Sequence, residues 1–80
     1  MANTTNNQKA EVKNYVNFDI VWRNGDKTHF SIDMRKHAYM IAGEYLVTVI
    51  KNDDGTVPDQ PTIIGSVNMK ETRTIKTYLS

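Results

Sequence analysis

The sequence predicts an α+β domain in which an antiparallel sheet of four to five strands packs with one short helix, in the order β-β-α-β-β-β. Three observations predict it. Apolar and polar residues alternate over residues 12–22 and again over 28–34, a period typical of half-buried strands. An Asn-Gly pair between these two runs is the strongest short-range signal for a β-hairpin. Apolar residues at helical spacing follow over residues 33–43.

The register of the hairpin can be derived from its two apolar sets. A two-residue Asn-Gly loop would turn these sets to opposite faces, which one core cannot satisfy. A three-residue loop ending at Gly25 instead pairs Phe18 with Phe30, and Gly25 then takes the left-handed conformation of a G1 bulge. On the outer face this register places Asp19 opposite His29. The residues expected to be buried together are Val16, Phe18, Ile20, Phe30 and Ile32.

The helix is expected over residues 33–43. Asp33 can cap its N-terminus, and Gly43 suits its C-terminal cap. The residues that form its apolar stripe are Met34, Ala38, Ile41 and Ala42. Residues 44–51 are ambiguous, because their apolar side chains would extend the stripe while the β-branched run 47–50 favours a strand. We favour a strand over 44–51 and keep a single long helix as the alternative.

The remaining chain is expected to form a loop and two further strands. Asp, Gly and Pro residues mark 52–61 as a loop, and residues 62–68 and 72–79 have strand composition. Gly65 is expected at a bulge or a close contact. A small, partly open barrel of the SH3-like kind is the alternative arrangement. Residues 1–10 lack large apolar side chains and are expected to be a flexible tail, which leaves residues 11–80 as one small β-rich domain.

Composition excludes several kinds of protein. The chain has 80 residues and no cysteine, which rules out a disulfide framework, a thiol nucleophile and a Cys-type zinc site. No apolar run is long enough to span a bilayer, and no secretory signal is visible. We therefore expect a cytoplasmic protein with no membrane partner. Ten basic against nine acidic residues give a net charge of +1, without the basic excess usual in nucleic-acid binders.

Catalytic and metal-binding constellations are incomplete. Ser66 follows a glycine but lacks the second glycine of a nucleophile elbow. His29, Asp33 and His37 are spaced by four, which on one helix could hold a metal, but His29 lies in a strong strand pattern. We therefore expect no enzyme, no cofactor and no metal site.

By elimination the chain is expected to be a non-enzymatic binding protein that acts through a protein–protein interface. In size it resembles the small accessory proteins of phages and mobile elements, and this resemblance implies that it inhibits or modulates a host protein. The alternative is a small nucleic-acid-binding domain that uses two basic clusters, Arg35 with Lys36 and Lys70 with Arg73 and Lys76.

Self-association is also expected. The last strand, residues 72–79, ends the sheet without a proline, so it could pair with a second copy in a homodimer or with a strand of another protein. The residues expected to bind a partner are Arg35, Lys36, Tyr39, Arg73, Ile75, Lys76 and Tyr78.

Overall fold

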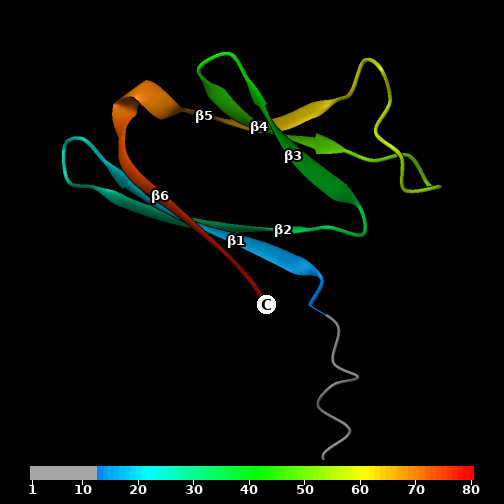
Figure 1. Ribbon diagram of the computed structural model, residues 1–80, viewed down its shortest axis with the longest axis horizontal. Helices are drawn as coiled ribbons and strands as arrows, with labels where there is room; N and C mark the ends of the chain where they lie inside the picture. The colour runs from blue at the N-terminus through cyan, green and yellow to red at the C-terminus, as the bar shows by residue number, and fades with distance from the viewer. Residues whose placement is uncertain (1–12) are drawn as a thin grey trace, which may run out of the picture.

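Six strands form two three-stranded antiparallel sheets (Figure 1). The computed structural model describes residues 13–80, so the tail expected over residues 1–10 lies outside the described residues. Sheet 1 has the strand order β2-β1-β6, and its strands are β1 (Tyr15–Trp22), β2 (Lys27–Asp33) and β6 (Thr72–Leu79). Sheet 2 has the order β3-β4-β5, and its strands are β3 (His37–Ala42), β4 (Tyr45–Ile50) and β5 (Ile63–Asn68). The chain passes between the sheets twice, after β2 and after β5.

The predicted α+β class is wrong. The described residues contain neither a sheet of four to five strands nor the helix over 33–43, and their strand ladders do not continue from one sheet into the other as an SH3-like barrel would require. Their helical structure is one 3₁₀ turn, η1 (Met69–Glu71), capped by the Asn68 side chain, which accepts from the Lys70 N–H. Within residues 13–80 no helix has the length and apolarity needed to cross a membrane.

Residues 33–43 form a turn and a strand because pairing with β4 overrides local helix propensity. Asp33 does cap backbone N–H groups, but those of a tight turn: its carboxylate accepts from the Arg35 N–H at 3.0 Å. Gly43 ends β3 with φ of 63°, in the two-residue turn that places Ala42 opposite Tyr45. Two-residue hairpin turns need positive φ at such a position. The strand favoured over 44–51 is confirmed as β4, and the single long helix does not form.

The predicted hairpin register is confirmed. Phe18 pairs with Phe30, and Asp19 with His29 on the outer face. Gly25 has φ of 93°, as the three-residue loop requires. The strands expected near 62–68 and 72–79 are also confirmed, as β5 and β6.

The hydrophobic core lies between the two sheets. Phe18 is its central residue: it is fully buried, stacks on Phe30 with ring centroids 4.8 Å apart, and meets Tyr39 of sheet 2 edge-on at 5.3 Å. The buried members of this cluster are Val16, Phe18, Ile20, Ile32, Leu46 and Val67. Phe30 is half-buried against it, so the expected buried set is confirmed except for partial exposure of that one ring.

A buried asparagine ties the three strands of sheet 1 together on the opposite face. Asn17 lies in the centre of the sheet with 7% of its surface exposed. Its side-chain amide donates to Ser80 Oγ at 2.8 Å and to the Tyr78 carbonyl at 3.2 Å, and its oxygen accepts from Ser31 Oγ at 2.5 Å. Because a buried amide is costly when unpaired, this network favours one alignment of β2, β1 and β6.

Phe18→Ala should lower the free energy of unfolding by about 3–5 kcal/mol, the usual range for a buried phenylalanine. Chemical denaturation followed by circular dichroism measures this change. Tyr45→Ala is the matched aromatic control, because Tyr45 is 46% exposed and should cost much less. Equal losses for the two variants would contradict the central position of Phe18.

Candidate functional site

A groove lies between the two sheets on the side where β2 and β5 are the outermost strands. Its volume is about 410 Å³, within the range of about 300–1,000 Å³ typical of ligand pockets. The residues that line it include Ile20, Trp22, Phe30, Ile32, Leu46, Ile64 and Val67. Because many of these residues also belong to the core or pack on it, the groove is a place where the apolar interior reaches the surface.

The aromatic walls of the groove are held in place. The Trp22 indole N–H donates to Thr28 Oγ1 at 2.8 Å, so the polar atom of the indole is already paired. Phe30 is fixed by stacking on Phe18. A partner that enters the groove therefore meets two pre-oriented apolar rings, which lowers the entropy cost of binding.

A β-bulge shapes the opposite wall. The β4–β5 register shifts so that Gly65 pairs with Thr48 while Ile63 pairs with Val49, which leaves Ile64 unpaired between them. Ile64 lines the groove with 48% of its surface exposed. A Cβ at residue 65 would lie 2.9 Å from Thr48 Oγ1, so any other residue here would have to displace the Thr48 hydroxyl. The bulge or close contact predicted at Gly65 is confirmed.

A second hollow, at the tip of the β1–β2 hairpin, is polar, and its groups already bind one another. It measures about 550 Å³ and is lined by residues of the loop and by Glu71. The Asn24 side chain accepts from the Asp26 N–H at 2.9 Å, and Arg23 donates its Nε–H to the Lys70 carbonyl. The first contact is turn chemistry and the second joins the loop to η1. These polar groups are already paired, so the apolar groove is the better candidate site.

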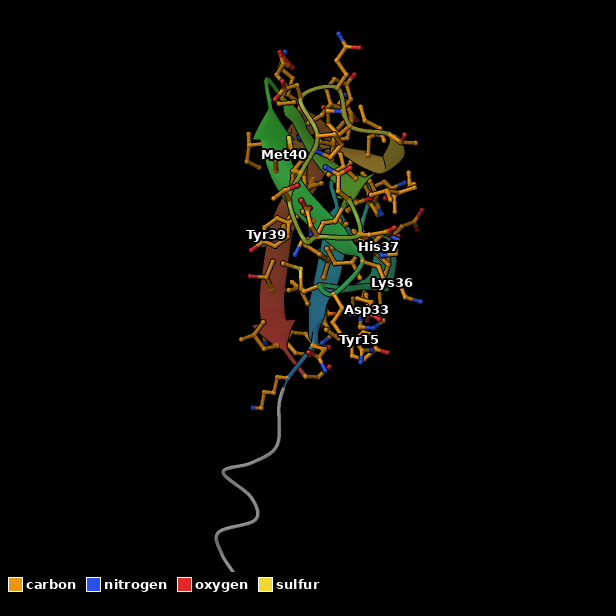
Figure 2. All side chains as sticks on the ribbon, turned by 90° about the vertical axis from the view of Figure 1, so that its right-hand side faces the viewer. Tyr15, Asp33, Lys36, His37, Tyr39 and Met40 are labelled. Atoms are coloured by element: carbon orange, nitrogen blue, oxygen red, sulfur yellow. The ribbon has the colours of Figure 1, made fainter. Side chains whose placement is uncertain are left out.

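The structure keeps the two expected basic clusters apart. Arg35 and Lys36 lie in the turn between β2 and β3. Arg35 contacts Asp33 and Tyr15, and Figure 2 shows Lys36 close to Asp33. Arg73 lies at the other end of sheet 1, where its guanidinium donates to the Arg23 carbonyl at 3.0 Å. The eight residues of β1 separate these ends by about 23 Å at ~3.3 Å per residue.

The other residues expected to bind a partner have different surroundings. Ile75 is half-buried against the core, whereas Lys76 lies over the Tyr78 ring at 6.0 Å on the outer face of β6. Lys70 pairs with Glu44 at 3.0 Å. Tyr39 contacts Phe18 but remains 42% exposed. These residues do not form one continuous surface.

Arg35 is held by a carboxylate and an aromatic ring. Its Nε and a terminal nitrogen both donate to the Asp33 carboxylate at 2.9 Å, and its guanidinium lies 5.8 Å from the Tyr15 ring centroid. The side-chain hydrogen bonds from Arg35, and then its backbone N–H, lower the pKa of Asp33 to about 2. Much of the Arg35 charge is therefore compensated within the turn.

The outer face of sheet 1 carries the predicted cross-strand pair. His29 Nδ1 lies 2.6 Å from Asp19 Oδ1, and both side chains are about half exposed. Asp19 is also opposite Lys76. Across residues 13–80, no group of three or more His, Cys, Asp or Glu side chains is placed to hold a metal ion.

Comparison of the chain with family models, with curated proteins and with solved structures found no match in any of the three.

Sequence reasoning missed the groove as a site. Phe30 was expected to be buried in the core, although it and Trp22, which also lines the groove, are only half-buried. The available signal was the consecutive pair Ile63-Ile64 beside Gly65, because neighbouring strand residues point to opposite faces and a glycine within a strand marks a bulge or a close approach.

Replacing Arg35 should raise the pKa of Asp33 from about 2 toward its ordinary value of about 3.9. A carboxyl group whose pKa is lower in the folded state stabilises the fold above the unfolded value and loses that contribution as pH falls from about 4 to about 2. In the Arg35→Met variant, the free energy of unfolding should therefore change less with pH over this range. A carbon-13 NMR titration of the Asp33 carboxyl measures the pKa. Lys36→Met is the control and should change it less, since Lys36 acts only through its charge.

Proposed function

We propose that this chain is a non-enzymatic binding protein that holds an extended, apolar segment of a partner protein in the groove between its two sheets. The observation that carries this proposal is the position of the groove: its walls are apolar and come from both sheets, and two of its strands, β2 and β5, are the outer edges of those sheets.

An extended segment fits this arrangement because the part of β2 that lines the groove, beyond Lys27 at the start of the strand, offers unpaired backbone N–H and C=O groups. In strand addition these groups supply affinity, and pockets for alternate side chains supply specificity. Trp22 and Phe30 provide large apolar contact surfaces of the kind that dominate protein interfaces.

The narrower expectation of an accessory protein from a phage or mobile element, acting as an inhibitor of a host protein, remains a prediction. It agrees with the proposed mode of binding, since a small domain that covers an extended segment of a larger protein can block that segment.

Selection of peptides from a displayed random library tests the proposed function. We expect apolar, strand-forming peptides whose binding changes the fluorescence of Trp22, the only tryptophan in the chain. Ile64→Asp should weaken their binding at least about tenfold, which corresponds to ~1.4 kcal/mol. Ile63→Asp is the control, because Ile63 is the adjacent residue, is 59% exposed and does not line the groove. Equal weakening by both variants, or binding that leaves Trp22 unperturbed, would argue against the groove.

Nucleic-acid binding is the weaker alternative, because Arg35 and Arg73 lie at opposite ends of sheet 1 and Arg35 and Lys70 have acidic partners. We expect only weak, nonspecific DNA binding that disappears near physiological salt, since few phosphates can be neutralised at once. Fluorescence anisotropy against labelled single- and double-stranded DNA across a salt series measures it. Sub-micromolar binding at about 150 mM salt would reverse the order of the two functions.

A further inference from the structure

Among residues 13–80, the edge of β3 differs from the other three sheet edges in having none of the usual protections. Charged side chains, prolines and bulges keep edge strands from pairing with other chains. β2 carries Lys27, β6 carries Arg73 and Lys76, and β5 contains the bulge at Ile64. β3 has the sequence HAYMIA and pairs with β4 without a register shift, so after His37 its edge is regular and uncharged.

The hydrogen-bond pattern shows which backbone groups this edge offers. Lys51 N–H donates to the Lys36 carbonyl at 2.8 Å, one step before the first β3–β4 pair. Antiparallel pairs alternate between bonded and non-bonded, so Ala38, Met40 and Ala42 are bonded to β4. The N–H and C=O groups of His37, Tyr39 and Ile41 therefore point away from β4, toward the open edge.

The side chains at this edge leave apolar surface exposed. Tyr39 and Ile41 share one face of β3, with 42% and 62% of their surfaces exposed. Figure 2 shows Tyr39 and Met40 along the left-hand margin of the molecule.

We propose that a second copy of this chain pairs with β3 through its own β3, related by a two-fold axis at Met40, so that two copies of sheet 2 become one continuous six-stranded sheet. In this register Tyr39 lies opposite Ile41 of the second copy, and residues with outward-pointing backbone groups face each other. Each such pair can exchange two main-chain hydrogen bonds and forms an aromatic–β-branched pair of the kind that stabilises sheets.

Charge complementarity selects a second copy as the occupant. The two-fold register brings the turn before β3, which contains Lys36, to the side of the second copy's turn after β3, which contains Glu44, and this juxtaposition occurs twice. When two copies of such a strand pair antiparallel, the basic residue before the start of one copy lies near the acidic residue after the end of the other. In the single chain Glu44 accepts from Lys70 at 3.0 Å, with more than half of each side chain exposed, so its carboxylate can also reach Lys36 of the second copy.

Sedimentation equilibrium on the full chain in the micromolar range tests the dimer. We expect a concentration-dependent dimer for the wild type and a monomer for Ile41→Lys, a change at an exposed side chain that should leave the fold intact by circular dichroism. Ile63→Lys is the matched control, since it adds the same charge at an equally exposed isoleucine on the other edge of sheet 2, and it should remain dimeric.

A charge exchange tests the register. Lys36→Glu and Glu44→Lys should each weaken the dimer, and the double variant should restore it. In the wild type the amides of Tyr39 and Ile41 should gain protection from hydrogen exchange as protein concentration rises, whereas those of β6 should not. A monomeric wild type, an Ile63→Lys variant that loses the dimer while Ile41→Lys keeps it, or a double charge variant weaker than both single ones would overturn the proposal.

Discussion

The structure depends on one buried aromatic side chain. Phe18 projects from the central strand of sheet 1, stacks on Phe30 in the same sheet and contacts Tyr39 in the other. No strand ladder joins the two sheets in residues 13–80, so they are held together by side-chain packing and by the two short connections. In so small a domain, packing at one such position is a large share of the total stability.

The groove is a consequence of the same arrangement. The two three-stranded sheets do not join into one closed ladder in residues 13–80, and the interior remains open along the side lined by β2 and β5. Residues that hold the sheets together therefore also form the floor of the candidate site. Ile20, Ile32 and Leu46 belong to both, so changes that deepen the groove also weaken the core. The rim position Ile64 is free of this conflict, because it is absent from the core cluster.

The hairpin and its register were predictable because the alternation of apolar residues and the turn geometry favoured the same pairing of Phe18 with Phe30. The strand β3, where a helix over 33–43 was expected, could not be predicted. It is an edge strand with apolar residues on both faces, so its sequence shows no clear period of two. Met34, Ala38 and Ile41 match helical spacing by coincidence, and the deciding interaction is pairing with β4, a segment that follows in sequence. The division into two sheets also could not be predicted, since it depends on where ladders stop rather than on which residues form strands.

The pairing of β1 with β6 has a consequence for folding kinetics. Val16 lies opposite Leu79, and Tyr15 and Ser80 exchange backbone hydrogen bonds at 3.0 and 2.9 Å, so the central strand acquires its second neighbour from residues some sixty positions away. The other ladders join strands that follow one another in sequence and can close early. Pairing of strands that are far apart in sequence is slow, because the entropy cost of closing the long loop precedes the stabilising contacts. During synthesis, one edge of β1 therefore remains unpaired until residues 72–79 have left the ribosome. Before that point, β1 can pair incorrectly with another strand.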